Sequence, residues 1–200
     1  MKRNVAIALV LGALCAAPVA AQTTGTPIFL APYMAGQSSD LGVYVTDPGR
    51  GFTVEGMWRL NQRTYDLGFR AGVGDSDPGP TVFLVGIDLR TTVVRASESF
   101  PLDGALTVGL GGNFADGQSV GLLPVGISLG REVRLEGSNT TFTPYVHPVL
   151  TPTFGDGPDD VEFALGLGVD IRFTPRFEVR VGAGIGDLPE GVSVGMAFLR

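Results

Sequence analysis

The segment 161–173 alternates apolar side chains with small or polar ones without a break, and this alternation constrains the fold more than any other feature. Valine, leucine, isoleucine and phenylalanine hold every odd position, while Glu, Ala, Gly, Asp and Arg hold the even ones. A period of two is the signature of a β-strand with two unlike faces. The segment 177–185 repeats the pattern after the short turn 174–176. The two segments therefore predict an antiparallel hairpin.

Reading outward from this hairpin gives ten candidate strands of the same kind. Most are close to the roughly 9–11 residues that a tilted membrane strand needs. The pattern predicts an all-β fold, an up-and-down antiparallel β-barrel of about ten strands, with eight longer strands as the alternative. A soluble ligand-binding barrel alternates as well, and the missing lysine and the aromatic positions described below favour the transmembrane barrel. The segment 28–36 is also strand-like, and we interpret it as a leading extension or as part of a long first strand. The ten predicted strands are 41–46, 51–60, 65–73, 82–91, 104–114, 122–135, 141–154, 161–173, 177–185 and 191–199.

The turns between these segments alternate in character. One set is short or plain, at 61–64, 137–139 and 174–176, with the longer stretch 96–103 as the exception. The other set is rich in Asp, Gly and Pro, at 47–49, 74–80, 116–117, 155–160 and 186–191. Each set should lie at its own end of the barrel. With both termini expected on the periplasmic side, the acidic set is predicted to be extracellular.

The first 21 residues have the layout of a secretory signal peptide. A basic start, Lys2 and Arg3, precedes an apolar run and the small residues Val19, Ala20 and Ala21. We therefore expect cleavage near Ala21, with the loss of Cys15, and a single barrel domain over residues 22–200. No later apolar run approaches the roughly 18 residues of a transmembrane helix.

Charge excludes several classes of function. Without residues 1–21 the chain has twelve basic residues, all arginine, against 20 acidic ones. Nucleic acid is an unsuitable partner for such a surface. One histidine and no remaining cysteine argue against a transition-metal site, and no cofactor is expected. The absence of lysine is unusual for a water-exposed surface.

The aromatic residues sort by height on the apolar face. If the turns are assigned correctly, one group lies near the periplasmic turns and the other near the extracellular loops. Two aromatic girdles are typical of the two membrane interfaces. The expected periplasmic girdle is Trp58, Tyr65, Phe142, Phe173, Phe177 and Phe198, and the extracellular one is Phe52, Phe83, Phe114, Phe154 and Phe163.

The last segment alternates Val192, Val194, Met196 and Phe198 and ends near an aromatic residue. In this the chain resembles the family of small bacterial outer-membrane β-barrels, and the resemblance covers residues 28–200. It implies a location in the bacterial outer membrane, with outer-membrane lipid, lipopolysaccharide and the barrel-assembly machinery as partners. It does not specify a ligand.

The inward face carries interleaved acids and arginines. Four acid–base pairs are two residues apart, and two more pairs are four apart. Unpaired charges in a narrow lumen are costly, so these groups should neutralise one another and close the lumen. The expected pairs are Asp88 with Arg90, Glu132 with Arg134, Asp170 with Arg172, Glu178 with Arg180, Glu55 with Arg59 and Asp66 with Arg70.

One predicted strand contains Pro144, Pro148 and Pro152, spaced four apart. The three missing N–H groups would point at one neighbouring strand and weaken pairing there. This side is a possible lateral seam, although a merely irregular strand explains the prolines as well. In the same strand His147 is expected to face inward as a hydrogen-bonded lumen residue.

These observations favour a non-enzymatic outer-membrane barrel with a structural or surface-interaction role and a lumen closed by arginine–carboxylate pairs. The alternative is a channel for small solutes, or for hydrophobic molecules that use a lateral opening. A lower alternative is a lipid-modifying enzyme that depends on His147.

Overall fold

A computed structural model of the chain describes residues 24–32, 39–49, 51–75, 79–156, 159–186 and 190–200. The predicted signal peptide, 1–21, lies outside the described residues. Twelve strands form one antiparallel sheet. Their bounds are β1 Asp40–Asp47, β2 Phe52–Asn61, β3 Tyr65–Asp75, β4 Thr81–Val94, β5 Asp103–Ala115, β6 Gln118–Leu122, β7 Val125–Gly130, β8 Val133–Arg134, β9 Thr141–Gly155, β10 Asp160–Thr174, β11 Phe177–Gly186 and β12 Gly191–Leu199.

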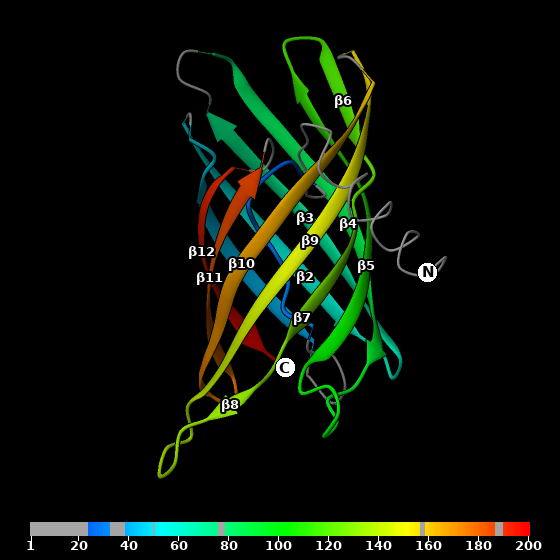
Figure 1. Cartoon of the computed structure of the whole chain (residues 1–200). Helices are drawn as coiled ribbons and strands as arrows, with labels where there is room; N and C mark the ends of the chain where they lie inside the picture. The colour runs from blue at the N-terminus through cyan, green and yellow to red at the C-terminus, as the bar shows by residue number, and fades with distance from the viewer. Residues whose placement is uncertain (1–23, 33–38, 50, 76–78, 157–158, 187–189) are drawn as a thin grey trace, which may run out of the picture.

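The sheet closes on itself as a barrel (Figure 1). Strand β12 returns to β1, with Asp40 opposite Leu199 and Asp47 opposite Val192. Each of the remaining strands pairs with at least two others, except the two-residue β8, which pairs with β9; β9 also joins β10. Because β6, β7 and β8 share one wall position, the twelve segments make a ten-strand barrel, as the alternation predicts. Among the described residues, no helix occurs that is long and apolar enough to cross a membrane.

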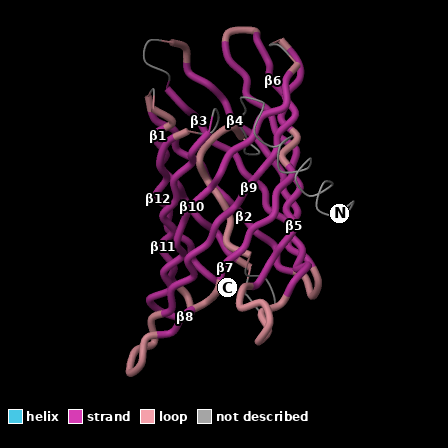
Figure 2. The backbone as a smooth tube through the Cα atoms, in the orientation of Figure 1, coloured by secondary structure: helices cyan, strands magenta, loops and turns pink. Residues whose placement is uncertain are grey.

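The two kinds of turn lie at opposite ends of the barrel (Figure 2). The turns 62–64, 95–102 and 175–176 lie at the end where β1 begins and β12 finishes. The acidic connections lie at the other end, which we call the loop end. There Asp116 and Gly117 both have positive φ, 45° and 78°, and form a two-residue hairpin turn.

The predicted continuous strand 122–135 is wrong in two respects. Pairing with β5 resumes directly after the 116–117 hairpin, so the strand begins at Gln118. It is then interrupted around Leu123 and Pro124, and again at Arg131. The register against β9 is nevertheless the same for β6, β7 and β8. Pro124 cannot donate a ladder hydrogen bond, so regular pairing breaks there.

Burial alternates along the strands, as in the pattern BeBeBeBe of β1. Inward glycines provide room for large inward side chains from the next strand. The ring of Tyr44 covers Gly195, and the phenol of Tyr145 covers Gly168, so tightly that a Cβ at either glycine would overlap the ring. The glycine-rich inner face therefore serves close packing inside a narrow barrel.

Residues 24–32 do not belong to the wall. They run inside the barrel, where Ile28, Phe29, Leu30 and Ala31 are buried. This corrects the interpretation of 28–36 as a strand extension, as far as Pro32; residues 33–36 lie outside the described residues. The reason is in the sequence: the apolar run 28–31 has no polar alternate positions, and Pro27 and Pro32 flank it.

Candidate functional site

The lumen is filled by a piece of the same chain, residues 24–32, which we call the internal segment. It begins towards the loop end, where Gly25 lies near Asn113 and Leu122. It descends inside the barrel to Pro32, which lies against Gly130 of β7 (Figure 2). The side chains of Pro27 and Pro32 are fully buried. The segment thus extends along much of the lumen.

The wall holds this segment mainly through its main chain. Five consecutive carbonyl groups, those of residues 27–31, each accept a hydrogen bond from a wall side chain. The donors come from five different strands. They are Ser193 Oγ to Pro27 O at 2.7 Å, Arg70 Nη1 to Ile28 O at 3.2 Å, Tyr145 Oη to Phe29 O at 3.1 Å, Ser128 Oγ to Leu30 O at 2.5 Å, and Arg90 Nη1 to Ala31 O.

The side chain of Phe29 has a fitted seat in the wall. Its ring lies directly on Gly166, at a position that a Cβ would occupy. The ring also meets His147 edge to face, with centroids 5.9 Å apart. Tyr145, Val149 and Ala164 complete this buried cluster around Phe29 and Ala31. On the opposite side of the segment Ile28 and Leu30 cluster with Tyr44 and Met57.

An arginine–aspartate network on β2, β3 and β4 lines one side of the segment. Arg59 pairs with both Asp66 and Asp88, the latter at 2.5 Å from Nη2. Asp88 also accepts from Arg70 Nε at 3.3 Å, and Asp66 from Arg90 Nη2 at 2.7 Å. All five side chains are nearly inaccessible to solvent. The bonds run across strands, so the expected same-strand pairs Asp66 with Arg70 and Asp88 with Arg90 do not form.

Three arginines and two aspartates leave this network with one excess positive charge. The excess is met in part by carbonyl groups, because Arg70 and Arg90 also donate to the internal segment. The buried Glu55 lies towards the loop end and accepts from Thr26 Oγ1 at 2.5 Å. The expected pair of Glu55 with Arg59 is therefore replaced by a contact with the internal segment.

A second network joins β10, β11 and β1. Arg180 pairs with Glu178 at 2.7 Å, as the two-residue spacing predicts, and with Asp40 at 2.8 Å. Arg172 pairs with Glu178 at 2.9 Å across the hairpin, where the register places them opposite each other. Asp170 lies 3.9 Å from Arg180 Nε. The expected pair of Asp170 with Arg172 is thus exchanged for cross-strand partners.

Glu132 and Arg134 lie at the edge of this second network. Glu132 is 4.0 Å from both Arg134 and Arg172. The predicted pair of Glu132 with Arg134 is therefore present at 4.0 Å, but the side chain of Arg134 is 72% exposed and does not fill the lumen. Arg134 lies opposite the inward Thr141 in the register, and it is exposed because β8 lies at the open end of the wall.

His147 is buried, with 1% of its surface exposed. Its Nδ1 accepts from the main-chain N–H of Leu30 at 3.3 Å, so Nε2 carries the proton and donates to Thr107 Oγ1 at 2.8 Å. Both ring nitrogens are therefore engaged in holding the internal segment and the wall together.

The aromatic residues of the two predicted girdles all point away from the lumen. Phe142 and Phe177 are half-buried and the other nine are exposed. At the end opposite the loops, Phe177 contacts Phe173 and Phe198, with centroids 6.3 and 5.6 Å apart. Trp58 contacts Phe69 at 6.0 Å. Near the loop end Phe83 and Phe114 are opposite each other in the register.

Pro144, Pro148 and Pro152 face outward on β9. On one side β9 pairs with β10 continuously, from Thr153 opposite Asp160 to Thr141 opposite Arg172. On the other side the register places the prolines opposite Arg131, Ile127 and Leu123, where regular pairing is interrupted. Leu123 and Arg131 still donate to proline carbonyls, at 3.0 and 3.3 Å. We call this side, between β9 and β6–β8, the proline seam.

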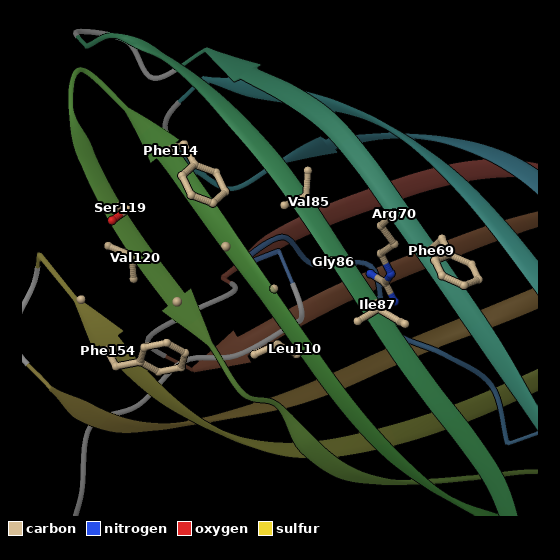
Figure 3. Close-up of a pocket in the computed structure, with 14 residues that line it drawn as sticks. Phe69, Arg70, Val85, Gly86, Ile87, Leu110, Phe114, Ser119, Val120 and Phe154 are labelled. Carbon is tan, nitrogen blue, oxygen red and sulfur yellow. The ribbon is translucent and has the colours of Figure 1, made fainter.

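Figure 3 shows an apolar hollow of about 570 Å³ in the barrel wall near the loop end. Outward side chains such as Phe114 and Phe154 form most of its lining, and Gly112 and Gly121 form low points between them. The hollow therefore belongs to the apolar outer belt. It is lined by Phe69, Arg70, Val85, Gly86, Ile87, Leu110, Gly111, Gly112, Phe114, Ser119, Val120, Gly121, Phe154 and Gly155.

Sequence reasoning missed the internal segment and most of its wall partners. Ser128 and Ser193 are ordinary small residues on an inward face, and nothing in their spacing marks them as donors. Asp40 could have been found, because it continues the inward positions of β1 by one step. For residues 24–32 the available signal was the loss of alternation between two prolines.

No protein-family model matches the sequence, and no curated protein is significantly similar to it. Solved structures do match. One is the crystal structure of the beta domain of the Bordetella autotransporter BrkA, with a TM-score of 0.52 and 12% sequence identity over 82% of this chain and 100% of that one. At this identity the likeness shows the fold: the chain is a closed ten-strand antiparallel β-barrel like that autotransporter beta domain.

Proposed function

We propose that this protein is an integral β-barrel of the bacterial outer membrane, exported by the signal peptide of residues 1–21, with a structural or surface-interaction role and a closed lumen. The exposed apolar belt supports the location, because side chains such as Val43, Leu110 and Val194 are about half exposed around the outside. Aromatic residues border this belt towards both ends. The fold shared with the BrkA beta domain is consistent with it.

The single observation that carries the closed lumen is the internal segment. Five of its consecutive carbonyl groups are bonded to five wall strands, and the phenylalanine ring between them sits on Gly166. The arginine–aspartate network occupies the space beside it. A hydrated ion would have to displace bonded protein atoms along most of this path. The lumen is therefore closed by the segment together with the charge pairs.

The test is single-channel recording of the refolded full chain in planar bilayers. We expect no steady conductance from the wild type. A Phe29→Arg variant should conduct, because a guanidinium cannot occupy the apolar seat without a partner. A matched Gly56→Leu variant, altered on the outer face, should remain silent. Steady channels from the wild type would refute the closed lumen.

The proline seam favours a second candidate function, passage of an apolar molecule between lumen and bilayer. Ile127 and Pro148 lie opposite each other where the ladder is interrupted. Cysteines at these two positions, in a Cys15→Ser background, would lock the seam as a disulfide. If the seam conducts apolar molecules, oxidation should stop transfer of a hydrophobic fluorophore across vesicles and reduction should restore it. Equal transfer in both states, or none in either, would exclude this function.

We propose no enzymatic role for His147. Both nitrogens are engaged, with Thr107 and with the main chain of Leu30, so neither is free to act as a base. Unchanged lipid A composition in cells that express His147→Ala is the expected result. As partners we propose outer-membrane lipid, lipopolysaccharide and the barrel-assembly machinery, the last through the closing strand β12. Slower assembly of a Phe198→Ala variant would support that partner.

A further inference from the structure

The wall of the lumen makes most of its hydrogen bonds to the internal segment with main-chain groups of that segment. The five donors to the carbonyls of residues 27–31 are side chains of β3, β4, β7, β9 and β12, and they surround the segment. The wall also accepts one hydrogen bond from the segment, because the main-chain N–H of Leu30 donates to Nδ1 of His147. Hydrogen bonds to main-chain groups require an extended backbone but are compatible with many sequences, as in other proteins that bind extended peptides.

Selectivity for the occupant arises at two places. The seat formed by Gly166, His147, Tyr145 and Val149 fits one aromatic ring. The clustered side chains of Tyr44 and Met57 favour aliphatic residues on the other side. The resident segment itself has proline at positions 27 and 32, both fully buried in the lumen. The site therefore suits an extended, uncharged peptide with one aromatic residue among aliphatic ones.

Charge points to the same class of occupant. Arg70 and Arg90 each have an aspartate partner in the wall and direct a further nitrogen at a carbonyl of the segment. Carbonyl dipoles satisfy these donors without adding a net charge. The carbonyl groups of residues 28 and 31 lie against the guanidinium groups of Arg70 and Arg90, and so a basic peptide is disfavoured.

We propose that the lumen is a peptide-binding site, that residues 24–32 are its resident ligand, and that the site also accepts a separate peptide of the same class once the resident segment is displaced. The inference rests on the proposed closed barrel. The resident copy is covalently tethered to β1, and its effective concentration is on the order of millimolar. A free peptide therefore competes only when the tethered copy is weakened.

The experiment uses the full chain with Phe29→Arg, recorded in planar bilayers as above. The probe is the synthetic peptide TGTPIFLAP, which is the sequence of residues 24–32 with blocked ends. We expect millimolar peptide to reduce the mean current about tenfold or more, since its buried phenylalanine ring favours the peptide over the ring-less resident segment by an affinity factor of about ten or more. A Phe29→Gly variant, which adds no charge, provides an independent open state if the arginine variant fails to fold.

Three controls isolate the site. A scrambled peptide of the same composition should leave the conductance unchanged, because its phenylalanine cannot reach the seat while its carbonyls face the donors. The double variant Phe29→Arg with Gly166→Leu should stay open in the presence of TGTPIFLAP, whereas Phe29→Arg with Gly56→Leu should close like its parent. The peptide methylated at the Leu30 nitrogen should close the pore less well, since it cannot donate to His147.

The outcomes separate this inference from the proposed function. If the wild type is silent and the variants conduct, but TGTPIFLAP does not close the variants, the peptide site is refuted and the closed barrel is not. Equal closure by the scrambled peptide, or silence of both Phe29 variants, would also overturn it. A conducting wild type would instead refute the closed barrel. Selective closure of the variants by TGTPIFLAP supports the site.

Discussion

Replacing Gly166 with alanine should loosen the internal segment, although the substitution lies on the wall and adds a single methyl group. The ring of Phe29 rests on the Cα of Gly166, and its nearest atoms occupy the place of the new Cβ. The backbone of β10 is fixed on both sides, because Gly166 lies opposite Gly184 of β11 and opposite His147 of β9. The ring must therefore leave its seat or distort the segment.

The magnitude follows from burial. Fully burying a phenylalanine side chain contributes about 1.5–3 kcal/mol. If the ring is expelled, the equilibrium between seated and displaced segment shifts by that amount, which is a factor of roughly ten to 150.

The assay is the reaction of a buried cysteine with a maleimide. In a Cys15→Ser background, Ala31→Cys places one thiol in the internal segment, where Ala31 is buried. Its labelling rate reports the displaced fraction, and adding Gly166→Ala should raise that rate about tenfold to 150-fold. An exposed Ser138→Cys thiol gives the intrinsic rate, and Gly56→Ala serves as the matched glycine change. An unaltered rate at position 31 would refute the fitted seat.

Three further predictions address the networks, the seam and the membrane. Arg59→Ala should lower the free energy of unfolding by about 3–5 kcal/mol, because it leaves two buried aspartates short of a partner, whereas the exposed Arg134→Ala should change it by about 0.5 kcal/mol or less; equal urea midpoints would contradict the assignment. Pro148→Ala supplies an N–H that points towards Ile127, so the new amide should exchange slowly with deuterium and the free energy of unfolding should rise by about 0.5–1.5 kcal/mol. Fast exchange of this amide would show that the missing proline N–H is not what interrupts the hydrogen bonds of the seam. Trp58, the only tryptophan, is 52% exposed on the outer face and should be quenched by brominated lipid chains, most strongly by bromine near the headgroups; absence of quenching would remove it from the membrane interface.

The wall of the barrel could be predicted from the sequence because its signals are local. Alternation with period two in segments such as 161–173 is a property of one strand, and it states which side chains share a face before any partner is known. The turn 116–117 and the two heights of the aromatic residues are likewise set along single strands and hairpins. Nine of the ten wall strands follow these signals, and the tenth fails where Pro124 interrupts the ladder.

The contacts that fill the lumen join residues of different strands, so the pattern of any one strand does not predict them. Arg59 bonds to Asp66 and Asp88 because the registers of β2, β3 and β4 bring them to similar heights, and Arg180 bonds to Asp40 because the sheet closes through β12. The spacing of these residues in the sequence does not determine the pairing. The fit of Phe29 on Gly166 joins residues 137 positions apart. The sequence by itself thus determined that the chain makes a two-faced barrel. Only the tertiary structure decided what fills it, because filling depends on the closed shape of the wall and on a segment that follows none of the wall's periodicity.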